Sequence, residues 1–113
     1  MTTLKNNVQL IGRLGNDPEL RTFDSGKKMT AFSMATNETY YNNKGEKVTD
    51  TQWHNIVAWG KKAEVIEGYL KKGSEIAIQG KLVNRKYEKD GVTKYITEIN
   101  LGEMLMLNKK EEV

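Results

Sequence analysis

The chain has 113 residues and a formal net charge of +3, with 37% hydrophobic and 29% charged side chains. This length suits one compact domain, and the composition excludes an intrinsically disordered chain. No apolar run exceeds four residues, so no segment can span a bilayer, and the first residues lack the apolar core of a signal peptide. Because there is no cysteine and one histidine, we expect no disulfide, no cofactor and no metal site, in a cytoplasmic protein.

Short segments separated by turn residues predict strands in the first half of the chain. Apolar residues alternate with polar or small ones over residues 4–14, and the Gly-Asn-Asp-Pro segment at 15–18 then turns the chain. A second turn at residues 24–26 precedes a strand over 29–36, in which bulky and small side chains alternate. Residues 40–50 are polar and are expected to form a long mobile loop.

The third predicted strand, residues 51–59, is rich in aromatic and β-branched side chains. Apolar residues three and four apart over residues 63–70 then predict a short helix. Lys71 and Lys72 at its end complement the helix dipole, and Gly73 is expected to stop it in a left-handed conformation.

Two further strands follow, over residues 74–87 and 93–101, joined by a hairpin turn whose Asp-Gly pair at 90–91 supplies positive φ. Five strands with a helix between the third and the fourth are the order of the OB-fold, an all-β, five-stranded antiparallel Greek-key barrel. We expect such a domain over residues 1–108, followed by a short charged end at 109–113. Another small β-barrel with a terminal helix fits less well, because the predicted helix lies mid-chain.

Two tryptophans share one face of the third predicted strand. Alternation places Trp53, Asn55 and Trp59 on that face, and Ile56 and Ala58 on the other. A tryptophan in a strand is commonly a core residue, which is the alternative interpretation. The polar Asn55 on the tryptophan face and the apolar residues on the opposite face favour a surface role.

Basic side chains lie beside an aromatic one in the fourth predicted strand. Arg85 and Tyr87 share a face there, flanked by Lys81 and Lys86, and residues 61–94 hold nine basic against five acidic side chains. A basic patch indicates a polyanion ligand, although many proteins that bind nothing charged also have one. Aromatic rings between Arg and Lys form a stacking platform that binds a single strand without reading its sequence, because every base has a π-face.

Several segments, in order and correctly spaced, resemble bacterial-type single-stranded DNA-binding proteins. The segments that carry the resemblance are GRLGNDPELR at 12–21, ATNETY at 35–40, WHNIVAWGK at 53–61, AE at 63–64, YLKKGS at 69–74, IQGKL at 78–82 and RKY at 85–87. The resemblance covers residues 4–107. It implies a protein that is not an enzyme, binds single-stranded DNA without sequence specificity, and protects it in replication, recombination and repair.

The resemblance also implies roles for individual residues. The base-stacking residues would be Tyr40, Trp53, Trp59 and Tyr87. The phosphate contacts would be Arg21, Lys61, Lys72, Arg85 and Lys86. Asn55, which is also expected to contact DNA, and Val83 occupy positions that are commonly basic in the family, so a shallower salt dependence is expected. Lys61 and Lys72 have the alternative interpretation of solvated helix ends.

The family resemblance implies assembly into a homotetramer built from two dimers, with a dimer as the alternative. His54 would lie at a subunit interface, and nothing near it in the sequence supplies the nucleophile and orienting carboxylate of a catalytic base. Alternation makes Glu75, Ala77 and Gln79 candidates for the dimer-pairing face.

Members of this family usually continue into a flexible tail whose acidic tip recruits other enzymes, whereas this sequence stops at Val113 without such a tip. We therefore expect poor recruitment of replication and repair enzymes. The expected partners are single-stranded DNA and further copies of the chain, in the nucleoid and not at a membrane.

Two other functions stay open at this point. A barrel of this type can prefer RNA, and contacts to the 2′-hydroxyl, which the sequence does not show, would decide between RNA and DNA. A small nuclease on the same barrel is the enzyme alternative, but the sequence offers no P-loop, carboxylate pair or metal-ligand spacing to support it.

Overall fold

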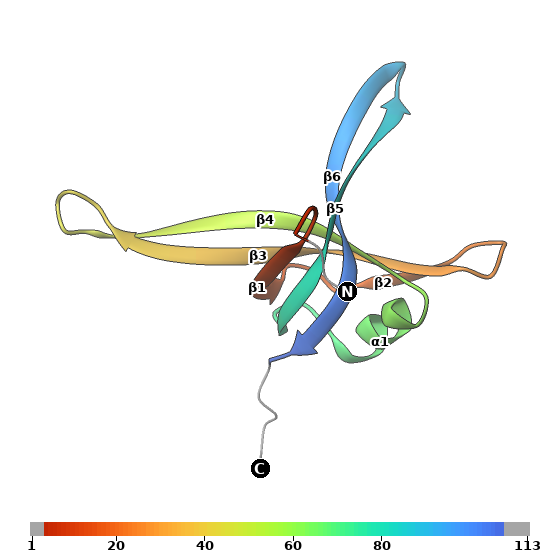
Figure 1. Cartoon of the computed structure of the whole chain (residues 1–113), viewed down its shortest axis with the longest axis horizontal. Coiled ribbons are helices and arrows are strands. Elements are labelled where there is room, and N and C mark those ends of the chain that lie inside the picture. Colours follow the sequence, from red (N-terminus) through yellow and green to blue (C-terminus); the bar gives the residue numbers. More distant parts are fainter. Residues whose placement is uncertain (1–3, 108–113) are drawn as a thin grey trace, which may run out of the picture.

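The chain forms a β-barrel from which hairpins project (Figure 1). This is a computed structural model, and the structure describes residues 4–107, so the charged end at 109–113 lies outside it. The elements are β1 (Val8–Leu14), β2 (Glu19–Thr22), β3 (Lys28–Tyr41), β4 (Lys47–Trp59), α1 (Lys61–Tyr69), β5 (Glu75–Lys89) and β6 (Val92–Met106). No helix in the described range is long and apolar enough to cross a membrane.

Five strands close the barrel in the order β1-β5-β6-β4-β3, and pairing of β1 with β3 joins its two ends. All pairs are antiparallel except β4 with β6, which run parallel for two register positions. Because α1 lies between the third and fourth barrel strands, the predicted OB-fold is confirmed. The short strand β2 was not predicted, and it extends the sheet along the edge of β3.

Alternate residues of the barrel strands point inward and pack with one side of α1. The buried cluster comprises Leu14, Phe32, Met34, Ile56, Ala58, Ile66, Leu70, Ile76, Ile78, Ile99 and Leu101. Ile66 of α1 and Leu70 just beyond it belong to this cluster, so the helix covers that side of the core. Fully burying a large apolar side chain contributes about 1.5–3 kcal/mol, which makes this cluster the main stabilising feature of the barrel.

The segment predicted as a loop over residues 40–50 is a β-hairpin, because β3 and β4 both extend into it. Asn42 closes the hairpin, since its Oδ1 accepts hydrogen bonds from the N–H groups of Lys44 and Glu46, both at 2.9 Å. This hairpin extends past the barrel and has no buried face. Its strands therefore carry polar side chains on both sides and show no alternating pattern in the sequence.

The helix ends earlier than predicted. The backbone is already extended at Leu70, so Lys71 and Lys72 lie beyond the helix and not in its last turn. The change of direction directs the Leu70 side chain into the core. Gly73 does have a positive φ of 91°, but in the turn after the helix, where its N–H donates to the carbonyl oxygen of Leu14 at 2.9 Å.

The predicted turns at residues 24–26 and 90–91 are confirmed. Asp90 and Gly91 have φ of 53° and 76°, which is the left-handed two-residue turn that joins β5 to β6. Gly26, with φ of 91°, lies in the turn between β2 and β3. The projecting hairpins raise the radius of gyration to 16.4 Å, against about 13 Å for a compact domain of this length.

Gly12 provides a test of barrel closure. A Cβ at this position would collide with the backbone oxygen of Ala35 on β3, beside the two register positions that join β1 to β3. We expect Gly12→Ala to lower the free energy of unfolding by about 1–3 kcal/mol, measured by urea denaturation, because a backbone atom cannot move aside. Gly68→Ala on α1, where a Cβ meets nothing within 4 Å, is the control and should be neutral or stabilising. A Gly12→Ala protein as stable as the parent would contradict this account of closure.

Candidate nucleic-acid interface

The outward face of β4 carries the two tryptophans. Trp53 and Trp59 are 61% and 42% exposed, whereas Ile56 and Ala58 on the opposite face are 0% exposed. Asn55 is exposed on the tryptophan face. The predicted alternation is therefore confirmed, and the alternative that the tryptophans form the core is wrong.

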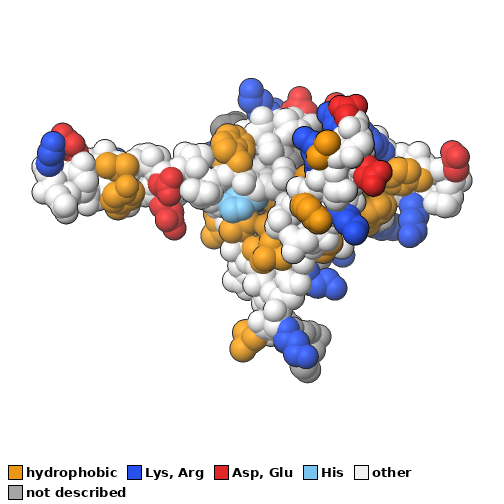
Figure 2. Space-filling model, turned by 90° about the horizontal axis from the view of Figure 1, so that it is seen from above, with side chains coloured by type: hydrophobic (Ala, Val, Ile, Leu, Met, Phe, Trp, Pro, Cys, Tyr) orange, Lys and Arg blue, Asp and Glu red, His pale blue; other side chains and the backbone are white. Residues whose placement is uncertain are grey.

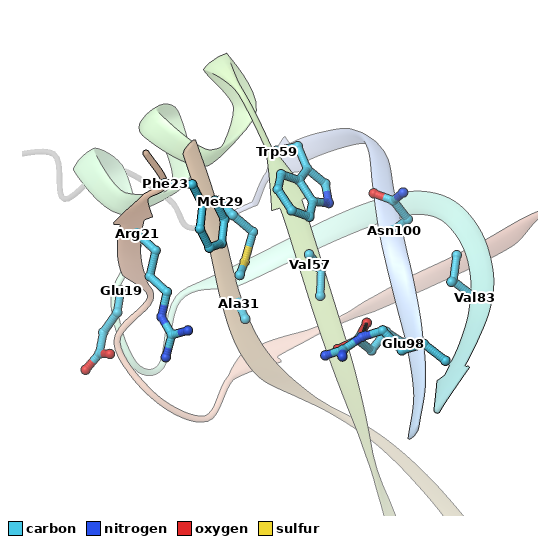
Figure 3. Close-up of a pocket in the computed structure, with 11 residues that line it drawn as sticks. Glu19, Arg21, Phe23, Met29, Ala31, Val57, Trp59, Val83, Glu98 and Asn100 are labelled. Atoms are coloured by element: carbon cyan, nitrogen blue, oxygen red, sulfur yellow. Dashed lines mark hydrogen bonds and ion pairs between the residues drawn. The ribbon is translucent and has the colours of Figure 1, made fainter. Parts of the chain in front are cut away.

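Next to Trp59 the barrel surface is hollowed into a groove of about 650 Å³ (Figure 3). Its floor includes Ala31 of β3 and Val57 of β4, which lie opposite each other in register. The other lining residues are Glu19, Arg21, Phe23, Met29, Val83, Arg85, Glu98 and Asn100. An apolar floor with charged side chains around it can accept flat apolar rings joined by charged groups.

At the side of the groove formed by β5 and β6, Glu98 engages Arg85. Two hydrogen bonds of 2.9 Å run from Nε and Nη2 of the guanidinium to the two carboxylate oxygens. Hydrogen bonding to Glu98 and its negative charge raise the pKa of Arg85 above its ordinary value. The Arg85 side chain is 56% exposed, so it can still meet a ligand. The predicted phosphate contact therefore lines the groove, but Glu98 balances its charge.

Trp59 contacts two residues that the sequence analysis did not single out. The ring of Phe23 stacks on it, with centroids 6.0 Å apart and an interplanar angle of 28°. The ammonium of Lys27 lies 6.0 Å from the centroid of the Trp59 ring. The available signal in the sequence was an aromatic residue directly before the Asp-Ser-Gly turn, where polar residues are usual.

Trp53 lies against the turn between β1 and β2. A Cβ at Gly15 would collide with Cζ3 of the indole, so the glycine allows the ring to approach the backbone. Asn16 fixes this turn, because its Oδ1 accepts hydrogen bonds from the N–H and the hydroxyl of Ser33, at 2.9 and 2.8 Å. The residue pattern at 15–18 predicted a turn, and the structure adds its contact with Trp53.

Three of the predicted DNA-binding residues lie on the projecting hairpins. Tyr40 is on the β3–β4 hairpin and Tyr87 on the β5–β6 hairpin, and both are about half exposed. Alternation places Lys86 on the opposite face of β5 from Tyr87. The structure does not bring these three residues together with the groove, so a ligand would reach them only by following the hairpins.

The remaining predicted cations lie closer to the tryptophans. Arg21 lines the groove. Lys61 is the first residue of α1 and follows Trp59 by two positions. Lys72 is exposed, and its backbone N–H donates to Oδ1 of Asp17 at 2.8 Å, in the turn that also contains Gly15. All three side chains are exposed, as a phosphate contact requires. Their roles as phosphate contacts stay predictions.

The predicted interface residues do not line the groove. His54 is half-buried, with Nε2 3.0 Å from the hydroxyl oxygen of Thr36. Glu75, Ala77 and Gln79 are half-buried in β5, which pairs with β1 on one side and β6 on the other. Their role in assembly stays a prediction. In the described part of the chain, no three His, Asp or Glu side chains are grouped so that they could hold a metal ion.

A model of the single-strand binding protein family matches residues 5–107. The chain belongs to this family. Membership confirms the resemblance seen in the sequence, and it confirms that the protein is a binding protein and not an enzyme.

Relatives with known names agree with this membership. The chain is 45% identical over 108 residues to single-stranded DNA-binding protein 1 of Chlorobaculum tepidum, covering 94% of this chain and 67% of the relative. It is 44% identical to the single-stranded DNA-binding protein of Neisseria meningitidis, covering 95% of this chain and 62% of that protein. These relatives are therefore longer than this chain.

Two solved structures share the fold. The Plasmodium falciparum protein described as an SSB complex with ssDNA has a TM-score of 0.83 and 34% identity, covering 96% of this chain and 99% of that one. A deletion mutant of the single-stranded DNA-binding protein from Thermus aquaticus has a TM-score of 0.79 and 27% identity, covering 91% of this chain and 50% of that one.

Proposed function

We propose that this protein binds single-stranded DNA without sequence specificity, by stacking bases on exposed aromatic rings while cations contact the phosphates. The observation that carries the proposal is the pair of exposed tryptophans on one barrel face, beside a groove with an apolar floor and arginines at its sides. Base stacking on aromatic residues suits this function because it is available to all four bases. The names of the relatives, and the complex of the Plasmodium protein with ssDNA, support DNA as the ligand.

The proposed stacking residues are Tyr40, Trp53, Trp59 and Tyr87. Trp53 and Trp59 are six residues apart on one strand, which is about 20 Å at the usual rise of a β-strand. A DNA strand that lies along β4 can therefore meet both tryptophans, and it can continue onto the hairpins that carry the tyrosines.

The proposed phosphate contacts are Arg21, Lys61, Lys72, Arg85 and Lys86, with Asn55 as a neutral polar contact between the tryptophans. Each phosphate contact releases counterions from DNA, so binding weakens as salt rises. Because Glu98 balances the charge of Arg85, we expect stacking to contribute a larger share of affinity than it would with unpaired cations.

The proposed role in the cell is protection of single-stranded DNA during replication, recombination and repair, in the nucleoid of the cytoplasm. We propose assembly as a homotetramer, or as a dimer, with His54 and the residues Glu75, Ala77 and Gln79 at the contacts. Sedimentation equilibrium at micromolar concentration measures the assembly, and a monomer there would overturn this part of the proposal.

The direct experiment measures quenching of tryptophan fluorescence by matched oligonucleotides of single-stranded DNA, double-stranded DNA and RNA. We expect strong quenching by single-stranded DNA of unrelated sequences. Tighter binding of RNA, or no binding of any single strand, would contradict the proposed function.

Replacing either tryptophan should weaken DNA binding with little effect on the stability of the fold. We expect Trp53→Ala and Trp59→Ala each to weaken binding by about 1–3 kcal/mol, the usual contribution of one stacked base. Their thermal melts should change little, because both rings are largely on the surface. Tyr69→Ala, an exposed aromatic residue on α1 outside the groove, is the control and should bind like the parent. A folded Trp53→Ala protein with unchanged affinity would remove that residue from the platform.

The pair of Arg85 and Glu98 yields a charge test. We expect Glu98→Gln to tighten binding at low salt, because it removes a carboxylate from the groove. Arg85→Ala should weaken binding and reduce the slope of log K against log salt by about 0.7, the value for one phosphate contact on a single strand. Salt-titrated affinities measure both effects. Lys62→Ala is the control, because it removes a lysine that does not line the groove. Equal affinities for Glu98→Gln and the parent would contradict a phosphate in the groove.

A further inference from the structure

A second hollow, of about 380 Å³, shares Trp59 with the groove. Its charged lining residues are Lys27, Lys28, Lys61 and Glu64. Lys28 is paired with Glu64 at 3.1 Å. No ion pair joins Lys27 or Lys61 to another residue of the described chain, so these two give the hollow its positive charge. The hollow therefore suits an anion placed beside the Trp59 ring.

The turn between β2 and β3 fixes an aromatic ring and a cation at this place. The N–H of Phe23 donates to the carbonyl oxygen of Lys27, and the N–H of Gly26 donates to that of Phe23, both at 2.8 Å. The positive φ of Gly26 allows the chain to reverse within this turn. As a result, Phe23 and Lys27 lie on the same side of the turn, and both contact Trp59.

Phe23 is not buried by this contact. It is 41% exposed, almost the same as Trp59, and it lines the groove together with that residue (Figure 3). A residue that only supported Trp59 from behind would be covered by it. Lys and Arg side chains lie beside hydrophobic ones at the end of the molecule that the β2–β3 hairpin forms (Figure 2). The two rings thus form a continuous aromatic surface with cations at its border.

We infer that the β2–β3 turn is a DNA-contacting element: Phe23 stacks the base next to the one on Trp59, and Lys27 with Lys61 binds the phosphate that joins the two nucleotides. This inference rests on the proposed function, and it adds Phe23 and Lys27 to the contacts that the family resemblance implied. A neutral apolar ligand would not need the cations, and a free anion would not need the two rings. A single-stranded nucleic acid uses both.

The first test compares variants of the two turn residues in binding to an oligothymidine. We expect Phe23→Leu, which keeps apolar volume but loses the ring, to weaken binding at least about five-fold, the lower end for one stacked base. Phe23→Tyr, which keeps the aromatic ring, should bind with the affinity of the parent. Lys27→Ala should reduce the salt slope by up to about 0.7, the value for one phosphate that it shares with Lys61, and Lys27→Arg should keep the slope of the parent. Tyr69→Leu, at an exposed aromatic residue outside both hollows, is the matched control.

The second test asks whether Phe23 touches DNA or only orients Trp59. An oligonucleotide that contains 5-iododeoxyuridine is bound to the protein, the complex is irradiated, and the crosslinked peptides are identified by mass spectrometry. A direct contact predicts a crosslink at Phe23 as well as at Trp59, with the Phe23 crosslink lost in Phe23→Leu. Crosslinks at Trp59 alone, with Phe23→Leu binding like the parent, would overturn the inference.

The outcomes separate this inference from the proposed function. If the parent binds, and Trp59→Ala weakens that binding whereas Phe23→Leu does not, the proposed function stands and the role of the turn is rejected. Failure of the parent to bind any single strand would reject both. Thermal melts of each variant identify any loss that comes from unfolding, and the surface position of Phe23 makes intact folding the expected result.

Discussion

The barrel closes where β1 leaves its partner β5 and meets β3. β1 pairs with β5 over six register positions but with β3 over only two, and Gly12 permits the crossing because any side chain there would collide with Ala35. Closure encloses the inward side chains of all five strands, and these supply most of the stability. It also forces the alternate residues of β4 outward, which is why Trp53 and Trp59 lie on the surface. The binding face is thus a direct consequence of the closed core.

The strands are longer than the barrel. β3, β4, β5 and β6 have 13 to 15 residues each, and their outer parts leave the core and continue as hairpins (Figure 1). Beyond the barrel these hairpins rely on cross-strand pairing and turn residues, because they have no apolar core to pack against. Segments of this kind open at lower free energy than a barrel core. The proposed site therefore combines a rigid platform on β4 with more adaptable aromatic residues on the hairpins.

Charge near the platform is partly balanced within the protein. Arg85 is held by Glu98, and Lys28 by Glu64, so two of the cations around Trp59 already have partners. Such pairs orient their side chains but reduce the net attraction for a polyanion. The aromatic rings, in contrast, stay open to a ligand, because Phe23 and Trp59 contact each other and still keep about two fifths of their surface exposed. Affinity in this protein is accordingly expected to depend on stacking, with charge as the weaker contribution.

The sequence by itself determined the order of the five barrel strands and the helix, the Asp-Gly turn and the two faces of β4, because strand alternation and turn chemistry are local properties of a few adjacent residues. It did not reveal the β3–β4 hairpin, since a hairpin without a buried face has no apolar alternation to detect. Only the tertiary structure placed Phe23 on Trp59 and Glu98 on Arg85. Phe23 and Trp59 come from segments far apart in the sequence, which the closed barrel brings together. Arg85 and Glu98 lie diagonally across the β5–β6 hairpin, and their contact depends on its cross-strand register and on the conformations of two long side chains, which no run of adjacent residues encodes.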